Sequence, residues 1–346
     1  MPERVTAVLK NYRALPKVEL HRHLEGTLRL QTMLDIARQH GITIPADIIR
    51  LSNLVQMQEQ ESYSFQNFLS KFNTLRLFYR SPDVIHRITR EAVEDAAKDN
   101  VRYLELRFTP VALSRAERFP LGDVIDWVIA SARDAAKQFG VTVRLIASVN
   151  RHESHELAEQ VAWLAVERKD RGLVGMDLAG NEAEFKSEPF YGVFKEARQA
   201  GLHITIHAGE WGPASNVREA IEELGAERIG HGVRVLEDGD IVALARERNT
   251  AFEVCVTSNF QSGVVPTLNA HPIKAMLETG LNVTINTDDP SISRITLSNE
   301  YQIICDDLGL SLDILKQRVL AAAQVAFLPD DGRQALAKQL TRELKL

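Results

Sequence analysis

The stretch Val18-Glu-Leu-His-Arg-His23 has the alternation of polar and apolar residues that is typical of a half-buried β-strand. Successive side chains of a strand point to opposite faces, so Glu19, His21 and His23 share one face. The opposite face is apolar apart from the charged end of Arg22. Because an apolar strand face packs beneath helices, the face with the two histidines must point away from the helices.

The same alternation recurs in two later stretches, 202–207 and 281–288. Each has one apolar and one polar face, and we expect both polar faces to point to the same interior as His21 and His23. The polar residues of these two stretches are His203, Thr205, His207, Asn282, Thr284, Asn286 and Asp288.

Short β-rich runs alternate with segments of helical periodicity along the chain. The predicted strands are 18–26, 101–108, 141–150, 173–180, 202–210, 228–233, 250–259 and 281–289. Predicted helices between them are 121–139, 154–168, 187–200, 217–224, 240–248 and 272–280. Parallel strands need crossover helices, so this alternation predicts an α/β fold of the (β/α)8 TIM barrel type.

The chain has 346 residues, whereas a minimal barrel of this kind takes about 250. We therefore expect a single domain over residues 1–346 with two additions to the barrel. Residues 41–100 are expected to form a helical insertion between the first and second strands, over the barrel mouth. Residues 291–346 are expected to form extra C-terminal helices against the wall. A doubly wound open sheet is the rival fold, but neither common glycine-rich phosphate loop occurs in the sequence.

Composition excludes several classes of protein. With Lys+Arg 41 against Asp+Glu 47, the formal net charge is −6 and there is no basic block, so we expect no nucleic-acid partner. The Cys count of 2 rules out a disulfide framework and a Cys-rich zinc module. No apolar run is long enough to span a bilayer, and the charged N-terminus resembles neither a signal nor a transit peptide. We expect a cytoplasmic protein with no membrane partner.

The predicted polar lumen is unusual, because barrel interiors are normally filled by Val, Ile and Leu. The second strand adds Glu105 and Arg107 to the lumen, and the seventh adds Glu253. Buried ionisable groups are costly unless they are paired or bind a metal. We interpret Glu105 and Arg107 as an ion pair that only stabilises the fold. Most of the histidines that face the predicted lumen lie near strand ends, where barrel enzymes have their active sites.

A metal site is predicted from four of these residues. His21 and His23 share a strand face, and His207 ends the fifth strand. Asp288 ends the eighth strand, which is next to the first strand in a closed barrel. Three imidazoles and one carboxylate suit Zn²⁺ or another borderline first-row metal rather than Mg²⁺ or Ca²⁺. The remaining coordination position would hold a water molecule.

Three candidate catalytic roles follow from position along the strands. Glu210 comes at the end of the fifth strand and can act as a general acid or base without binding the metal. His231 ends the sixth strand and can hydrogen-bond the water. Asp288 can accept a proton from that water while it binds the ion.

The remaining histidines and the cysteines have less specific interpretations. His203 lies deeper along its strand, and we expect it to pack or to support a ligand. Cys255 and Cys305 are expected to be buried apolar side chains. Solvated or capping roles are expected for His40, His86, His152, His155 and His271.

Seven stretches together identify a family, although no single one does. The chain resembles the adenosine deaminases, which are (β/α)8 barrels of the metal-dependent hydrolase superfamily, from residue 15 to about residue 290. The stretches, in family order and spacing, are LPKVELHRHLEGTLR, YLELRFTP, MDLAGNE, HITIHAGE, ERIGHGVR, TSNFQS and VTINTDDP.

The resemblance implies hydrolysis of adenosine and 2′-deoxyadenosine to inosine and 2′-deoxyinosine, with release of ammonia, in purine salvage. A small purine nucleoside is then the binding partner. One Zn²⁺ per subunit is expected, because the fourth strand lacks the Lys that bridges two metals in binuclear relatives. The implied ligands are His21, His23, His207 and Asp288.

The resemblance also implies roles around the purine. Glu210 would protonate the ring nitrogen next to the reacting carbon, and His231 would orient and polarise the water. Asp289 would hydrogen-bond the ring nitrogen on the five-membered side, and Gly180 would offer its backbone N–H to a pyrimidine-ring nitrogen. His23 would border the substrate as well as the metal.

Four apolar residues recur at the spacing of one helix face, at Phe65, Phe68, Leu69 and Phe72. The stripe predicts an amphipathic helix that packs on the barrel. The resemblance adds a second role, a hydrophobic lid over the purine and the sugar. Both can hold, with only some of the four residues touching the substrate.

Glu25 departs from the family pattern, because many adenosine deaminases have Asp there, near the sugar 5′-hydroxyl. Glu occurs in related enzymes that act on adenine or on modified adenosines. The alternative substrate is therefore adenine, or a 5′-modified adenosine such as 6-amino-6-deoxyfutalosine. The runs at 177–182 and 257–261 resemble the nucleoside enzymes and favour adenosine.

A hypothesis from another class is a catalytically inactive barrel kept as a nucleoside sensor or a secreted growth-factor-like relative. Such a protein would lack a metal ligand or the catalytic acid, and it would have a signal peptide. The sequence shows neither mark.

Overall fold

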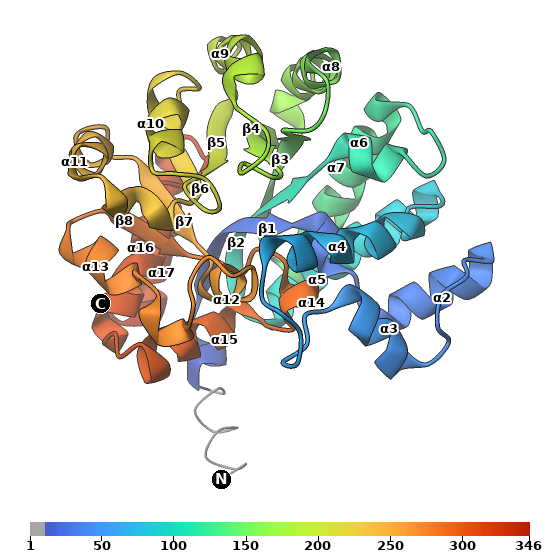
Figure 1. Cartoon of the computed structure of the whole chain (residues 1–346), viewed down its shortest axis with the longest axis horizontal. Coiled ribbons are helices and arrows are strands. Elements are labelled where there is room, and N and C mark those ends of the chain that lie inside the picture. The colour runs from blue at the N-terminus through green and yellow to red at the C-terminus, as the bar shows by residue number, and fades with distance from the viewer. Residues whose placement is uncertain (1–10) are drawn as a thin grey trace.

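Eight parallel strands form the centre of the molecule, with helices around them (Figure 1). The structure is a computed structural model that describes residues 11–346. Neighbouring strands pair in the order of the chain, as the alternation of strands and helices predicts. The strands are β1 Lys17–His23, β2 Val101–Phe108, β3 Thr142–Asn150, β4 Leu173–Ala179, β5 His203–Ala208, β6 Arg228–His231, β7 Ala251–Val254 and β8 Asn282–Ile285.

The barrel closes between β8 and β1 through the chain just beyond β8. The backbone N–H of Asp288 donates to the carbonyl of His21 at 2.9 Å, and the N–H of His23 donates to the carbonyl of Asp288 at 2.9 Å. The side-chain oxygen of Asn286 accepts from the N–H of Leu20 at 2.8 Å. Closure therefore brings the carboxylate of Asp288 next to the two histidines of β1, which are far from it in sequence.

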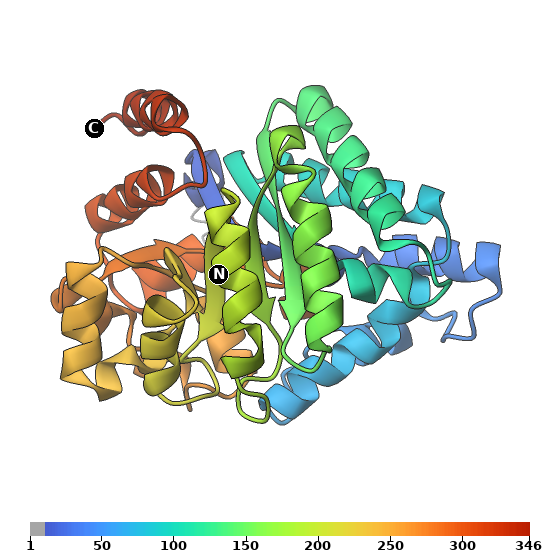
Figure 2. The ribbon, with the colours of Figure 1, turned by 90° about the horizontal axis from the view of Figure 1, so that it is seen from above.

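Helices cover the outside of the strands (Figure 2). Amphipathic periodicity predicts these helices, and the predicted helix 121–139 has the bounds of α7. Among residues 11–346, no helix is long and apolar enough to cross a membrane. The helices are α2 Leu30–His40, α3 Ile48–Val55, α4 Phe65–Leu75, α5 Pro82–Lys98, α6 Pro110–Ser114, α7 Leu121–Phe139, α8 His155–Val166, α9 Tyr191–Gln199, α10 Ser215–Glu222, α11 Gly239–Glu247, α12 Val256–Gln261, α13 Ile273–Glu278, α14 Pro290–Ser293, α15 Leu297–Gln302, α16 Leu312–Gln324 and α17 Asp330–Leu344.

The predicted strands at 18–26 and 250–259 are too long. The first ends at His23, and a short 3₁₀ helix over Leu24–Thr27 follows it. The second is only the four residues of β7, because helix α12 begins at Val256. The buried carboxylate of Glu300 accepts the backbone N–H of Val256 at 2.9 Å and of Thr257 at 3.2 Å, which satisfies the first turn of that helix.

Alternation also fails at one point of β1. Alternation places Glu19 and Arg22 on opposite faces, but their side chains form an ion pair at 2.5 Å. The register between β1 and β2 shifts between these two residues, as it does at a β-bulge. Glu19 also accepts the backbone N–H of Thr287 at 3.0 Å, so it supports barrel closure instead of sharing a face with His21 and His23.

The two additions to the barrel lie in different places. Within residues 41–100, α4 lies at the barrel mouth, whereas α5 packs outside, against α7 and β2 (Figure 1). At the C-terminus, α16 packs on β8 and β1. The turn between α16 and α17 covers the end of the barrel opposite the mouth, because the Phe327 ring lies 3.4 Å from the Arg228 guanidinium carbon and stacks on His203 at 4.5 Å.

Phe327→Ala is expected to lower the free energy of unfolding by about 3 kcal/mol, as deletion of a buried aromatic side chain does. The Phe327 side chain is buried, and it shields the Arg228 guanidinium from water. Urea unfolding midpoints measure the effect, with Leu312→Ala at an exposed site of α16 as the control. Equal midpoints for the two variants would contradict this account of the C-terminal turn.

Candidate metal centre and active site

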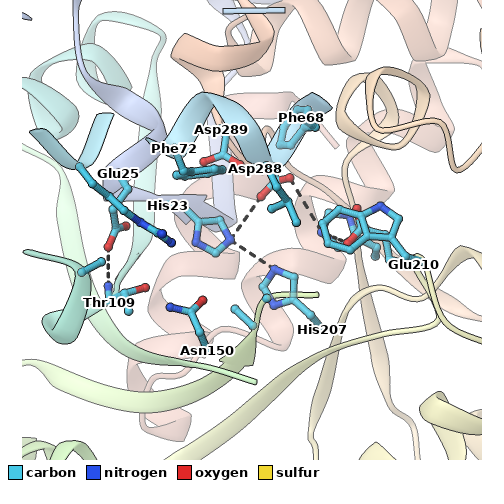
Figure 3. A pocket seen from close by; sticks show the side chains of 17 residues that line it. His23, Glu25, Phe68, Phe72, Thr109, Asn150, His207, Glu210, Asp288 and Asp289 are labelled. Carbon is cyan, nitrogen blue, oxygen red and sulfur yellow. Dashed lines mark hydrogen bonds and ion pairs between the residues drawn. The ribbon is translucent and has the colours of Figure 1, made fainter. Parts of the chain in front are cut away.

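A cavity of about 640 Å³ opens at the C-terminal ends of the strands. The predicted residues His23, His207, Glu210, His231 and Asp288 line it together. Figure 3 shows His23, His207 and Asp288 pointing toward one another at its base. The strand ends thus form one site from residues that are up to 265 positions apart in the chain.

All four predicted metal ligands come together at this base. Asp288 Oδ1 lies 3.2 Å from His21 Nε2 and 3.3 Å from His23 Nε2. The Nε2 atoms of His23 and His207 are 3.2 Å apart. Ligand atoms of His21, His207, His231 and Asp288 also lie within 4.8 Å of one another. Two atoms bound tetrahedrally to one ion at about 2.0–2.1 Å are roughly 3.3 Å apart, so these spacings fit one metal ion.

Buried carboxylates orient two of the imidazoles. His21 Nδ1 lies 2.8 Å from Glu253 Oε2, and His207 Nδ1 lies 2.9 Å from Asp177 Oδ1. Each carboxylate accepts the Nδ1 proton, which leaves Nε2 without a proton and able to bind a metal. His21 Nε2 is buried and has no hydrogen-bond partner among residues 11–346. A metal ion would satisfy this atom.

The lumen below the site contains ion pairs, but they differ from the predicted one. Arg107 pairs with Glu253 at 2.7 Å and with Asp177 at 3.3 Å, not with Glu105. Glu105 instead pairs with Arg228, which also contacts Glu253 at 2.6 Å. Two residues on one strand face, such as Glu105 and Arg107, are about 6.6 Å apart along the strand. Oppositely charged side chains from other strands lie closer, and each residue pairs with those instead.

The balance of charge in the lumen also fits a divalent cation. With Asp288, four carboxylates face the guanidinium groups of Arg107 and Arg228, which leaves two formal negative charges. Burial holds the pKa of His23 and of His231 well below the usual value for histidine, so both imidazoles are neutral. Neutral imidazole is the form that binds metals.

Glu210 lies in a loop that another buried carboxylate holds in place. Glu182 accepts the backbone N–H groups of Gly209 at 3.0 Å, Glu210 at 2.5 Å and Trp211 at 2.6 Å. The Glu210 side chain is free of these bonds and lines the cavity, with Oε2 3.6 Å from His231 Nε2. Burial raises the pKa of Glu210 well above the usual value for glutamate. A protonated carboxyl group in this position can donate a proton to a ligand.

Two residues of the site have a left-handed backbone, with φ +61° at His231 and +67° at Asp288. Such conformations are costly outside glycine and persist where the surrounding structure enforces them. Asn259 Nδ2 lies 3.0 Å from His231 Nδ1, and Ser258 donates to Asp288 Oδ2 at 2.6 Å. Both supporting residues come from α12, in the stretch that was expected to be a strand.

The predicted purine-binding residues line the same cavity. Gly180 has φ +92°, which favours glycine, and it lines the cavity together with Asp289 and Glu25. Asp289 Oδ1 is buried without a hydrogen-bond partner in the described chain. Gly26 is required here, because a Cβ atom at this residue would lie 1.8 Å from Asp289 Oδ1.

Helix α4 lies at the cavity mouth, and only three of its four predicted residues line the cavity. Phe68, Leu69 and Phe72 do so, whereas Phe65 stacks on Trp211 with ring centroids 5.5 Å apart. Phe65 thus lies beside the cavity and not in its wall, and it packs on Trp211, which does line the cavity. The Arg76 side chain, just after α4, also lines the cavity.

The residues with less specific interpretations mostly match expectation. His203 pairs with Glu227 at 2.9 Å at the far end of the barrel, so it is a packing residue and supports no ligand. Cys255 is buried, and Cys305 is half-buried. His271 is not solvated, because it is buried and accepts the N–H of Ile273. His152 and His155 are exposed, and His40 and His86 are half-buried.

Several residues of the site do not stand out from residue type alone. Asp177 and Glu182 both lie in the stretch MDLAGNE, and Ser258 and Asn259 both lie in TSNFQS. The match of these two stretches to the family could have indicated these residues, because neither stretch contains a predicted metal ligand that would explain the match. Arg76 had no comparable signal, since its contact with the cavity depends on how α4 docks.

Comparisons with known proteins find relatives that match almost the whole chain. The family model described as "Adenosine deaminase" matches residues 16–343. An adenosine deaminase from Salmonella schwarzengrund is 38% identical over 329 residues, which cover 94% of this chain and 98% of the relative. An adenosine deaminase from Shigella flexneri is 36% identical over 327 residues, with the same coverage.

Solved structures of similar proteins include three with different stated substrates or ligands, each 28% identical to this chain. An amidohydrolase from Burkholderia ambifaria with bound Zn has a TM-score of 0.89 and covers 97% of this chain and 92% of its own. An adenine deaminase from Arthrobacter aurescens has a TM-score of 0.88, with coverage of 96% and 100%. An Arabidopsis N6-mAMP deaminase has a TM-score of 0.85, with coverage of 96% and 99%.

Asp177→Asn is expected to weaken metal binding about 10–100-fold, the usual effect of losing a carboxylate that orients a histidine ligand. The amide has the shape of the carboxylate but neither its charge nor its ability to accept at both atoms. Chelator competition measures the affinity. Ser148→Ala is the matched control, since it removes only a 3.1 Å hydrogen bond to the other oxygen of Asp177. Equal affinity in the two variants would remove Asp177 from the metal site.

Proposed function

The chain belongs to the adenosine deaminase family, and on that premise we propose that its site holds one Zn²⁺ and hydrolyses adenosine and 2′-deoxyadenosine. The products are inosine and 2′-deoxyinosine, with ammonia. The protein is a metal-dependent aminohydrolase with a small purine substrate. One observation carries the proposal: an acid, Glu210, faces His231 and lines the same cavity as the proposed metal ligands His23, His207 and Asp288.

Zinc follows from the ligands. His21, His23, His207 and Asp288 would hold the ion, and three imidazoles with one carboxylate suit it better than Mg²⁺ or Ca²⁺. One ion is proposed because contacts of 3.2–3.3 Å connect all four ligands and β4 has no Lys. When bound, the ion supplies a hydroxide nucleophile at neutral pH by lowering the pKa of water.

The residues of the chain perform the remaining chemistry. Glu210 donates a proton to the ring nitrogen beside the reacting carbon, so negative charge does not build up on the purine as oxygen adds to that carbon. His231 hydrogen-bonds that oxygen, and Asp288 accepts its proton. The proton on Asp288 then passes to the amino group, the carbon–nitrogen bond breaks, and ammonia leaves. The proton that remains on the oxygen returns to Glu210 as the carbonyl forms.

Other residues hold the purine in place. The backbone N–H of Gly180 bonds a pyrimidine-ring nitrogen, and Asp289 bonds a nitrogen of the five-membered ring. Burial and the neighbouring carboxylate of Asp288 raise the pKa of Asp289 well above the usual value, so it can donate that bond. His23 borders the substrate at the metal, and Phe68, Leu69 and Phe72 cover it and exclude water.

A second candidate substrate is a purine nucleoside with an anionic group at the 5′ position. Arg76 lines the cavity and forms no ion pair with any described residue. Glu25, on the same cavity wall, accepts the Thr109 N–H at 2.6 Å, and burial raises its pKa to about 7. An unpaired guanidinium beside a carboxyl group that can be neutral favours a phosphate or carboxylate on the substrate.

Ammonia release from a panel of substrates tests the function. We expect turnover of adenosine and 2′-deoxyadenosine that a chelator abolishes and added Zn²⁺ restores, with one zinc per chain by metal analysis. Adenine, AMP and 6-amino-6-deoxyfutalosine complete the panel. Preference for AMP or for 6-amino-6-deoxyfutalosine, which have an anionic group, would favour the second candidate. That preference should disappear in Arg76→Met. Release from none of the five, with zinc bound, would contradict the function.

Glu210→Gln is expected to lower kcat on adenosine by at least about 100-fold, because the amide cannot donate the proton. Zinc content should stay unchanged, since Glu210 is not among the proposed ligands. Glu159→Gln, on the exposed face of α8, makes the same chemical change away from the site and should retain full activity. Full activity in Glu210→Gln would refute the role of Glu210 as the acid.

A further inference from the structure

We propose that Asn259 and His271 fix the tautomer of His231, so that the Nε2 atom in the cavity always has a proton and can only donate a hydrogen bond. We call the placement of protons on His271, Asn259 and His231 the proton order. Its meaning for catalysis rests on the proposed function, but the proton order itself follows from the hydrogen bonds. Neither Asn259 nor His271 lines the cavity, so both are positioning residues that act through His231.

The order begins at a backbone amide, which can only donate. The N–H of Ile273, at the start of α13, donates to His271 Nδ1 at 3.2 Å. That nitrogen must therefore be without a proton. His271 is buried, and burial lowers its pKa to about 3, so at neutral pH the ring has one proton. The proton must then be on Nε2.

The second link orients an amide side chain. His271 Nε2 lies 3.2 Å from Asn259 Oδ1 and donates to it, since Nε2 has the proton. This bond requires the carbonyl end of the amide to face His271, so the NH₂ end faces the other way. Asn259 is completely buried, so bulk solvent does not reach either end of its amide. Its amide orientation is thus decided by a backbone N–H fourteen residues further along the chain.

The third link reaches the cavity. Asn259 Nδ2 lies 3.0 Å from His231 Nδ1 and donates to it, so this nitrogen is the acceptor. A neutral His231 must then have its proton on Nε2. That atom points to Glu210 Oε2 at 3.6 Å and to Asp288 Oδ2 at 3.9 Å. His231 is therefore a donor to negative charge, and proton acceptance is left to the carboxylate of Asp288.

Nitrogen NMR of the holoenzyme labelled with ¹⁵N-histidine tests the proton order without a mutation. Resonances are assigned by their loss in His231→Asn and His271→Asn. We expect both histidines to be neutral, with a proton on Nε2 and a bare Nδ1. A proton on Nδ1 of His231 would overturn the proposal, whether or not the enzyme deaminates adenosine. A failure of the proposed function would instead appear as no ammonia release with this proton order intact.

Asn259→Asp tests the consequence for catalysis. The carboxylate has the same shape but can only accept, so His231 must acquire a proton on Nδ1. We expect kcat on adenosine to fall about 100-fold, as on loss of a preorganised donor, with KM and zinc content unchanged. Asn53→Asp, an exposed site on α3, is the matched control. A kcat within twofold of the wild type, with the His231 resonances unchanged, would overturn the proposal.

Discussion

The structure depends on the carboxylate of Glu253, which is completely buried and is shared by side chains from four other strands. Oε2 accepts from Arg107 at 2.7 Å and from His21 at 2.8 Å, and Oε1 accepts from Arg228 at 2.6 Å and from Thr205 at 3.1 Å. A buried charge is tolerated only when it is paired and hydrogen-bonded. These strands must therefore all be in register before Glu253 is stabilised, and the same bonds orient a metal ligand.

The ion pairs connect the two ends of the barrel. Arg228 contacts Phe327 at the closed end, and His21 presents Nε2 to the cavity at the open end. The stability of the C-terminal turn and the geometry of the metal site thus depend on one set of charges. Such a lumen costs stability compared with a core of aliphatic side chains. The cost is consistent with a site that needs a fixed negative charge beneath a cation.

Buried carboxylates and amides also hold the loops above the strands. Glu182 fixes the loop with Glu210, Glu300 fixes the start of α12, and Asn259 and Ser258 on that helix hold His231 and Asp288. Loops usually have high mobility, yet catalysis needs groups placed to within fractions of an ångström. Here the loop backbone is bonded by side chains that do not line the cavity, and the proposed catalytic side chains stay free to face it.

The sequence by itself determined the barrel, and it placed the proposed metal ligands and the proposed acid at strand ends, because the periodicity of strands and the ends of strands are local properties. It could not determine that Arg107 pairs with Glu253 and not with Glu105, or that Phe65 turns away from the cavity. Those outcomes depend on the register between strands and on the docking of α4, which bring together residues distant in the chain. Only the tertiary structure decided them, because a buried charge takes the nearest opposite charge in space, wherever it lies in sequence.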